Sequence, residues 1–276
     1  MDDKESIKRH YNQIPNKSRQ ERRHTRNINI RNANNFIKSC IIKSYVKPCD
    51  SVLDIGVGKG GDFIKYQIAK VKEVYGLDIA NRSILDALSR ARESHIDFKL
   101  VLKVKDCFTT RFDLRKKFDI VSIQFSFHYC FAKEEYVHVT LDNIEKHLVK
   151  NGHVLITIPC KEEILKRAKE DNLSNRFYSI RFKDRDSEKI YGNAYYYTLL
   201  DSVNDCVEYL VDMKTLVSKA QQRGLELVKN TPFREFYDEN AKLYTELHDR
   251  LVSRPLNKEE EEVVSLHHII VFKKIS

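Results

Sequence analysis

Long apolar runs are absent from this chain. The longest mostly apolar stretches, such as residues 154–158 and 269–272, fall far short of the roughly 20 residues that a membrane-spanning helix needs. The first residues, MDDKESIKRHYN, contain no apolar segment of the kind found in secretory signal peptides. We therefore expect no membrane span, no secretion and no membrane partner.

Paired metal-binding cysteines are absent as well. Six cysteines occur at scattered positions, with no CxxC pair and no histidine at the spacing of a familiar zinc site. This usage is typical of reduced thiols in an intracellular protein. We expect structural cysteines and no metal centre.

Glycine is scarce, with 8 in 276 residues, where average usage would give about 19. Four of the eight, Gly56, Gly58, Gly60 and Gly61, lie within six residues. Because glycine lets another molecule approach the main chain closely, this cluster indicates a ligand-binding loop.

What the chain does have is positive charge, 49 Lys and Arg against 40 Asp and Glu, a formal net charge of +9. Between residues 8 and 31 there are eight basic residues and one acid, a local balance of +7. A basic stretch with few large apolar residues cannot bury itself. We expect residues 1–30 to form an arm that stays mobile until it meets an anion such as nucleic-acid phosphate; the alternative is a solvated tail that only aids solubility.

Strand and helix patterns alternate through the first half of the chain. Apolar runs that predict strands lie at 51–55, 73–77, 98–104, 118–125 and 153–158, and helical spacings at 32–45, 62–69, 82–92 and 136–148. This alternation predicts an α/β fold with a parallel sheet, helices on both faces, and a ligand at the carboxyl ends of the strands.

Beyond Pro159 the pattern loosens. We expect a helix through 164–169, strands near 206–211, 225–229 and 267–273, and a helix at 213–223. The acids at 259–262 indicate the exposed side of a helix N-terminus, and the tyrosines at 195–197 are interpreted as core and sheet surface. One domain over 31–276, with an insertion at about 160–212, fits this order best.

The segment VLDIGVGKGGD fits both the GxGxG and the GxGxxG patterns, so glycine spacing alone does not choose between S-adenosylmethionine and a dinucleotide. In either case Asp78 is placed to accept from ribose hydroxyls. Asp54 would repel a pyrophosphate but suits a cationic cofactor, and Asp106 is placed to accept from an adenine amino group. These acids favour S-adenosylmethionine, unless Asp54 or Asp106 only caps the following turn.

Four segments together, VLDIGVGKGGD, GLDIA, QFSFHY and NIRNANNFIK, resemble the eukaryotic mRNA cap guanine-N7 methyltransferases. The resemblance runs from about residue 10 to residue 272. It implies the class I S-adenosylmethionine-dependent methyltransferase fold, which is Rossmann-like, with a seven-stranded, mostly parallel sheet. It also implies that the protein methylates N7 of the 5′ guanosine of mRNA and releases S-adenosylhomocysteine.

The resemblance assigns two sets of binding residues. Positions that match the family's cofactor site are Lys38, Gly56, Asp78, Asp106, Gln124 and Tyr129, to which the loop reading adds Asp54 and Gly58. Positions that match its cap site are Asn34, His128 and Glu208, together with the basic residues Lys59, Lys65 and Arg90. Because guanine carries an O6 acceptor beside N1–H and N2 donors, a donor such as His128 and a carboxylate such as Glu208 would select it over adenine.

The chain departs from the family pattern at two positions. Val57 replaces the cysteine usual between the first two loop glycines, where the backbone makes the contacts. His267 stands where the family generally carries a cap-contacting tyrosine. His267 is therefore interpreted either as a cap residue that stacks or donates, or as an ordinary strand residue.

Methylation at N7 needs no general base, because the nitrogen brings its own lone pair. We expect His128, Tyr129 and Glu208 to orient the base rather than to act as acids or bases. Expected partners are the capped 5′ end of mRNA and the transcription or capping machinery, with the protein a nuclear monomer.

Three other interpretations stay open at this point. The chain could be a class I methyltransferase that acts on another RNA base, a protein or a small molecule. It could be a non-catalytic RNA-binding subunit of the same fold, although such a scaffold need not keep its cofactor loop. An NAD-dependent dehydrogenase is disfavoured, because no hydride-transfer residues follow the loop.

Overall fold

The computed structural model describes residues 3–17 and 19–276. Its main sheet has seven strands in the order β3-β2-β1-β4-β5-β10-β9. β10 is antiparallel to both of its neighbours, β5 and β9, and the other pairs are parallel. Their bounds are β1 (Ser51–Ile55), β2 (Glu73–Asp78), β3 (Lys99–Val104), β4 (Phe118–Gln124), β5 (Leu148–Pro159), β9 (Leu225–Pro232) and β10 (His267–Lys274). The expected seven-stranded, mostly parallel α/β sheet is confirmed.

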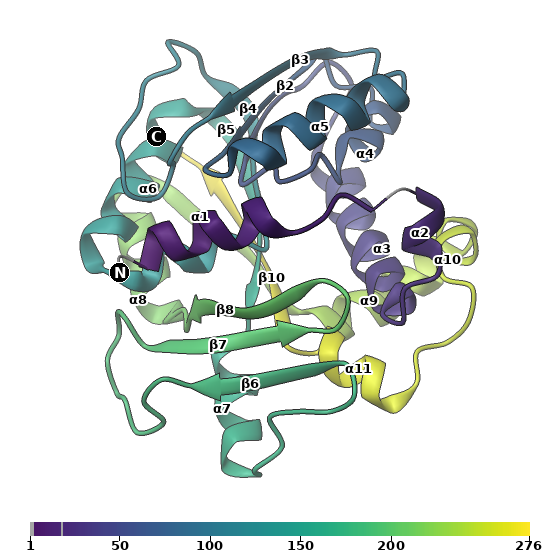
Figure 1. The fold of residues 1–276 in the computed structure, drawn as a ribbon. Helices are drawn as coiled ribbons and strands as arrows, with labels where there is room; N and C mark the ends of the chain where they lie inside the picture. The colour runs from purple at the N-terminus through teal and green to yellow at the C-terminus, as the bar shows by residue number, and fades with distance from the viewer. Residues whose placement is uncertain (1–2, 18) are drawn as a thin grey trace.

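Helices cover both faces of this sheet (Figure 1). Alternate strand residues point to opposite faces, so Val52 belongs to one apolar cluster and Leu53 to the other. The first cluster is shared with α3 (Ile28–Tyr45), α4 (Phe63–Ile68), α5 (Asn81–Glu93), α9 (Phe233–Leu243), α10 (Thr245–Leu251) and α11 (Lys258–Val264). The second is shared with the 3-10 helix η1 (Phe127–Ala132), α6 (Glu134–His147) and α8 (Met213–Gln221).

A second sheet of three antiparallel strands occupies most of the expected insertion. It comprises β6 (Tyr178–Phe182), β7 (Ala194–Leu199) and β8 (Val203–Tyr209), and α7 (Lys161–Lys169) precedes it. The expected strand near 206–211 is the end of β8. Strand β6 was not predicted, although its residues, YSIRF, alternate apolar and polar side chains. In Figure 1 this sheet lies below the helix α1 (Asp3–Gln13), which crosses the middle of the molecule.

The N-terminal segment differs from the expectation of an arm that cannot bury itself. Its described residues contain α1 and α2 (Arg19–Arg23). Ile7 and Tyr11, four residues apart on one side of α1, pack against the second apolar cluster. This short apolar stripe explains why α1 lies on the domain, and the mobility of the arm stays a prediction.

The acidic residues of α11 also depart in part from the expectation, which was the exposed side of a helix N-terminus. Residues 259–261 do form its first turn, as expected, but Glu260 is 1% exposed. Its carboxylate accepts from Asn29 at 3.0 Å and from Arg254 at 2.7 Å. It also closes a capping box with Asn257.

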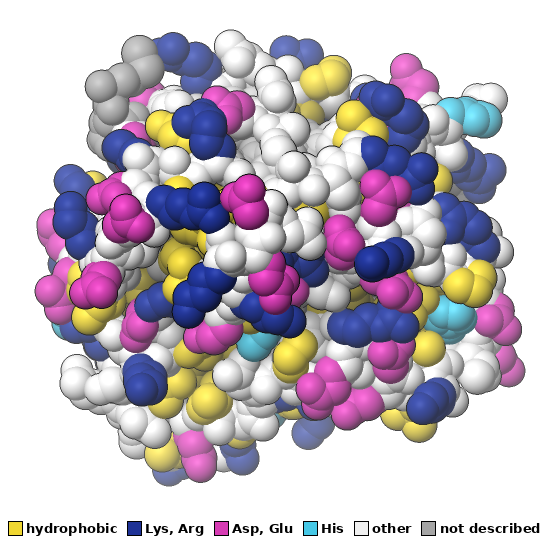
Figure 2. Space-filling model, turned by 90° about the horizontal axis from the view of Figure 1, so that it is seen from below, with side chains coloured by type: hydrophobic (Ala, Val, Ile, Leu, Met, Phe, Trp, Pro, Cys, Tyr) yellow, Lys and Arg dark blue, Asp and Glu magenta, His cyan; other side chains and the backbone are white. Residues whose placement is uncertain are grey.

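Charged side chains of both signs are interspersed over the face seen from below in Figure 2. No helix among residues 3–17 and 19–276 combines the length and apolarity that crossing a bilayer requires. Because charges of both signs are mixed on this face, anion binding would depend on the positions of individual basic residues rather than on a continuous basic surface.

Candidate active site

A cavity of about 300 Å³ opens at the carboxyl ends of β1, β2 and β4. This is the edge of a parallel sheet at which ligands bind in open α/β folds. Six of the eight residues expected for the cofactor line it, namely Gly56, Gly58, Asp78, Asp106, Gln124 and Tyr129. The other two, Lys38 and Asp54, are not in its wall.

The glycine loop forms one side of the cavity. Gly56 has φ +75°, and a Cβ there would lie 2.9 Å from the Ser126 Cβ, so a side chain is excluded both by conformation and by space. Gly58 has φ +53°, and its N–H donates to the Asp78 carboxylate at 2.8 Å. The loop is thus folded onto the acid that follows β2.

Asp78 projects from the end of β2 into the same cavity. One carboxylate oxygen accepts from Gly58 N–H and the other from Ala80 N–H at 2.8 Å. Burial raises the pKa of Asp78, opposed by these backbone hydrogen bonds. Each oxygen keeps a lone pair for a further donor, such as a ribose hydroxyl.

Asp106 caps the turn after β3 and also lines the cavity. Its carboxylate accepts from the backbone of Phe108 at 3.1 Å and of Thr109 at 3.0 Å, so it caps the turn after β3. It also lines the cavity and pairs with Lys4 of α1 at 2.6 Å.

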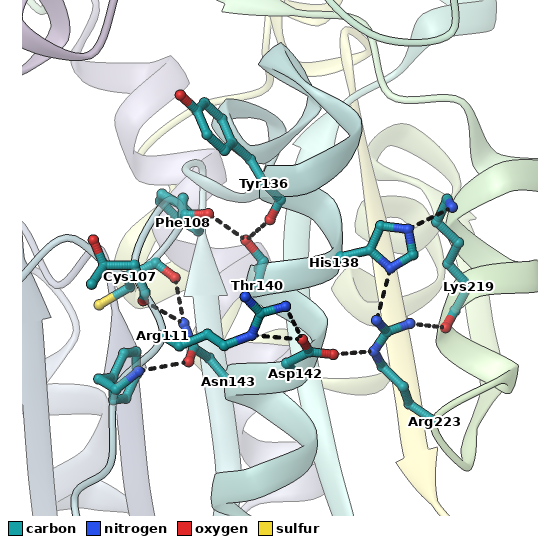
Figure 3. Close-up of polar contacts among 12 residues, drawn as sticks. Cys107, Phe108, Arg111, Tyr136, His138, Thr140, Asp142, Asn143, Lys219 and Arg223 are labelled. Atoms are coloured by element: carbon teal, nitrogen blue, oxygen red, sulfur yellow. Dashed lines mark hydrogen bonds and ion pairs between the residues drawn. The ribbon is translucent and has the colours of Figure 1, made fainter.

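Helix α6 holds the loop that carries Asp106 (Figure 3). The Asn143 amide donates to the carbonyls of Cys107 at 2.9 Å and Thr110 at 3.0 Å, and its oxygen accepts from Phe112 N–H at 3.1 Å. One side chain therefore fixes three points of the loop. On the helix face beyond it, Asp142 pairs with Arg111 and Arg223.

Lys38 and Asp54 belong to a buried charge cluster beside the glycine loop. Asp62, the last residue of VLDIGVGKGGD, pairs with Lys38 at 2.7 Å and with Lys65 at 2.8 Å. Asp54 accepts from the Tyr66 hydroxyl at 3.1 Å, and burial together with the nearby Asp62 charge raises its pKa to about 8. The sequence analysis missed Asp62, although it ends the quoted motif.

Helix α1 supplies a wall of the cavity that the sequence analysis did not anticipate. Lys4, Ile7 and Tyr11 all line it. The Tyr11 hydroxyl lies 2.8 Å from that of Tyr129. The only sequence signal was the four-residue spacing of Ile7 and Tyr11.

His128, Glu208 and His267 come together as a buried polar cluster, although they are up to 139 positions apart in the sequence. The His128 Nε2 lies 3.8 Å from the Glu208 Oε1, too far for a hydrogen bond. Burial, and the proximity of His267, lower the pKa of His128 to about 3. Both histidines are therefore neutral at pH 7, since burial also lowers the pKa of His267 to about 4.

Glu208 is held by a residue that the sequence analysis assigned to the core. The Tyr195 hydroxyl donates to the Glu208 Oε2 at 2.6 Å. Burial raises the pKa of Glu208 to about 7. The Oε1 is left facing His128.

This cluster contains several buried polar atoms without a hydrogen-bond partner among the described residues. They include both ring nitrogens of His128 and the Nδ1 of His267. The His267 ring also contacts Phe125, with centroids 5.1 Å apart, and Phe233, at 5.4 Å. Since buried polar groups are normally paired in native proteins, the unpaired atoms point to a polar ligand between aromatic rings.

The remaining cap candidates lie around α3, α4 and α5. The Asn34 Oδ1 on α3 is buried without a partner among the described residues. Lys59 pairs with Asp86 at 2.8 Å and also donates to the Ile14 carbonyl at 2.8 Å. Arg90 lies near Lys65, whose pKa falls mainly through burial and partly through this neighbouring charge. The three basic residues are thus gathered beside the glycine loop, where Lys59 pairs with Asp86 and Lys65 with Asp62.

The cavity and the polar cluster meet at η1. Tyr129 is in the cavity wall, and the residue before it, His128, is in the cluster, with their ring centroids 4.3 Å apart. A ligand in one site would therefore lie next to a ligand in the other.

Comparisons with known proteins identify the family of this chain. The model of the mRNA (guanine-N(7))-methyltransferase domain matches residues 1–275. An mRNA cap guanine-N(7) methyltransferase of Schizosaccharomyces pombe is 33% identical over 97% of this chain and 81% of its own length. The protein of that name from Saccharomyces cerevisiae is 37% identical over 84% of this chain and 58% of its own length.

Among solved structures, the N-methyltransferase NodS of Bradyrhizobium japonicum, in complex with S-adenosyl-L-homocysteine, superposes with a TM-score of 0.56. The match covers 100% of both chains at 12% identity and so bears on the fold alone. The fold is that of the S-adenosylmethionine-dependent methyltransferases, and the match across residues 1–275 shows that this chain belongs to the mRNA (guanine-N(7))-methyltransferase family.

Proposed function

We propose that the protein transfers the methyl group of S-adenosylmethionine to N7 of the guanosine that caps the 5′ end of mRNA. The observation that carries the proposal is the meeting of the cofactor cavity with a buried, unpaired polar cluster at Tyr129 and His128. Family membership supports the same reaction.

The cavity residues fit S-adenosylmethionine. Asp78 would accept from the ribose hydroxyls and Asp106 from the adenine amino group, while the buried Gln124 Oε1 has no partner among the described residues and is available to the ligand. The glycine loop would lie against the methionine part of the cofactor. When bound, S-adenosylmethionine supplies an electrophilic methyl group on a sulfonium and leaves as S-adenosylhomocysteine.

The role of Lys38 and Asp54 at the cofactor would be indirect. Lys38 supports the start of α4 through its ion pair with Asp62, and Asp54 supports the same helix by accepting from the Tyr66 hydroxyl.

Base recognition would rest on His128 and Glu208. A neutral His128 can donate one ring N–H to O6, and the Glu208 Oε1 can accept from N1–H, because its partner Oε2 is already held by Tyr195. Adenine offers the opposite pattern at these atoms and would leave both groups unpaired. The aromatic rings around His267 would lie against the base and exclude water.

Catalysis would come mainly from orientation. N7 carries its own lone pair, so the protein has no proton to remove before transfer. Holding the base beside the cofactor at η1 can supply about 7 kcal/mol through proximity alone. Lys59, Lys65 and Arg90, together with Asn34, would hold the triphosphate bridge and the cap nucleoside.

The deciding experiment is methylation of GpppA with tritiated S-adenosylmethionine, followed by mapping of the product. The expected product is m7GpppA, with much less transfer to GTP or to uncapped RNA. Methylation of another base or of a small molecule would show that the cap is not the substrate. Cofactor binding without methyl transfer would support a non-catalytic subunit.

The proposed substrate has consequences for the protein's location and partners. Cap methylation of nascent transcripts would place it in the nucleus, in contact with the transcription or capping machinery. With one copy of each site in the chain, a monomer would suffice. Light scattering would test this, with 32.6 kDa expected.

A further inference from the structure

Tyr197 lies on β7 on the face of the three-stranded sheet that carries Glu208. Tyr195 is paired in register with Glu208, and Tyr197 with Cys206. Because side chains two residues apart on a strand point to the same face, Tyr195 and Tyr197 both flank Glu208. The pairing of β7 with β8 becomes irregular just after Tyr197, as strands often do beside binding sites.

The two tyrosine hydroxyls differ in their partners. The Tyr195 hydroxyl donates to Glu208, whereas that of Tyr197 is buried and has no hydrogen-bond partner among the described residues. The Tyr197 side chain is only 7% exposed. Burial raises its pKa, and the Glu208 charge raises it further, which places the hydroxyl near the carboxylate.

A buried hydroxyl without a partner costs stability, so its retention needs a reason. Here the other unpaired atoms of the neighbourhood, on His128 and His267, belong to the cluster already assigned to the base. Tyr197 and His128 both lie next to Glu208. The three side chains are therefore placed to form hydrogen bonds with three neighbouring atoms on one edge of a base.

We propose that the Tyr197 hydroxyl accepts a hydrogen bond from the exocyclic N2 amino group of the cap guanine. The proposal rests on the proposed function. In this arrangement His128 donates to O6, the Glu208 Oε1 accepts from N1–H, and Tyr197 accepts from N2. Since hypoxanthine has the same O6 and N1–H but lacks the N2 amino group, Tyr197 makes the site selective for guanine over hypoxanthine.

The experiment compares wild type and Tyr197→Phe on two cap analogues, GpppA and its inosine counterpart IpppA. The variant removes one oxygen atom. We expect kcat/KM for GpppA to fall roughly 5-fold to 10-fold, as for loss of one neutral hydrogen bond, while that for IpppA stays within about 2-fold. The preference for guanine would then largely disappear.

Two further measurements separate this role from a structural one. Since the hydroxyl has no hydrogen-bond partner within residues 3–17 and 19–276, Tyr197→Phe should unfold at a temperature no lower than wild type and bind S-adenosylhomocysteine equally well. Tyr196→Phe, on the opposite face of β7, is the matched control and should leave both substrates unaffected.

The outcomes are distinct. Equal losses on GpppA and IpppA, or no loss on either, would overturn the assignment of Tyr197 while leaving the cap reaction intact. A wild-type protein that fails to methylate GpppA at N7 would instead overturn the proposed function.

Discussion

At the scale of single residues, the charge of Glu208 decides how well the base is held. Its pKa is raised to about 7 by burial, so the carboxylate loses its proton as the pH rises through neutrality and becomes a stronger acceptor. We expect kcat/KM for GpppA to increase between pH 6 and pH 8. His128 and His267, with pKa values lowered to about 3 and about 4, stay neutral throughout.

Glu208→Gln tests the origin of this pH dependence, because Asp54 also titrates near pH 8. The variant should lose the rise and show both a lower kcat and a higher KM, by roughly 10-fold overall, since the N1–H becomes a stronger donor as the ring gains charge. A change in KM alone would mean that Glu208 binds the base equally before and during transfer. An unaltered pH profile would assign the rise to Asp54.

The same residue makes a prediction about stability. A carboxyl whose pKa rises from 4.5 to about 7 on folding stabilises the fold when protonated, and this contribution is lost as the pH rises through that range. Without ligand, Glu208→Gln should therefore be more stable than wild type at pH 8, by about 2 to 3 kcal/mol. The difference should shrink as the pH falls from 7 to 4.5. Urea unfolding at several pH values measures it, and a variant less stable than wild type at pH 8 would contradict it.

Residues of the glycine loop and of strand ends carry a local sequence signal, whereas His128, Glu208 and His267 were named only through the family resemblance, and Tyr195 was not named as a site residue at all. Gly56, Gly58 and Asp78 follow from one loop and the next strand end. Tyr195 becomes significant only through its hydrogen bond to Glu208, which the antiparallel register of β7 and β8 creates. The pairing of Tyr195 with Glu208 cannot be predicted from residue spacing, because the pairing of β7 with β8 is irregular.

At the scale of elements, the sequence predicted best where an apolar strand ends at a glycine or an acid. The bounds of β1 were predicted to the residue, and those of β2 to within one residue. Helix α1 was missed because its apolar stripe is only two residues long, and a helix of this kind gains its stability from the surface on which it packs. The three-stranded sheet was predicted only in part, because β6 was missed although its five residues, YSIRF, alternate apolar and polar side chains.

Helix α6 makes a prediction of its own, through its hold on the loop after β3 (Figure 3). Asn143→Ala removes three hydrogen bonds to that loop and should raise KM for S-adenosylmethionine roughly 10-fold, because Asp106 is no longer fixed. KM for GpppA should change little. Glu135→Ala, on the exposed side of the same helix, is the matched control.

The split between the two Michaelis constants is the informative result. A variant that only lost stability would affect both substrates or neither at a temperature well below its unfolding midpoint. Equal increases in both constants would show that Asn143 supports the whole domain rather than the adenine side of the cavity.

At the scale of the whole molecule, the two sites are assembled from different layers. The cofactor cavity uses the main sheet, the loop after β3 and α1, whereas the base cluster uses η1, β10 and the three-stranded sheet. Three elements contribute to both sites: η1, and also β7 and β8, since Ala194 and Tyr209 line the cavity. Most cofactor candidates carry a local signal in the first half of the chain, at the glycine loop and at strand ends. The base candidates His128, Glu208 and His267 were named only through the family resemblance, and the fold brings them together.

Net charge acts at this same scale, since the chain carries +9 overall although the surface of Figure 2 mixes both signs. Binding of capped RNA should weaken as salt rises, with a slope of roughly 0.7 to 0.9 for each phosphate that the protein neutralises. GpppA, with three phosphates, should show a smaller slope than a capped RNA of about 20 nucleotides if the basic residues of α1 contact the transcript. Exchange of Lys8 and Arg9 for Gln should then reduce the slope for RNA and leave that for GpppA unchanged. Equal slopes for the two ligands would limit phosphate contacts to the Lys59, Lys65 and Arg90 group, and an affinity independent of salt would exclude that group as well.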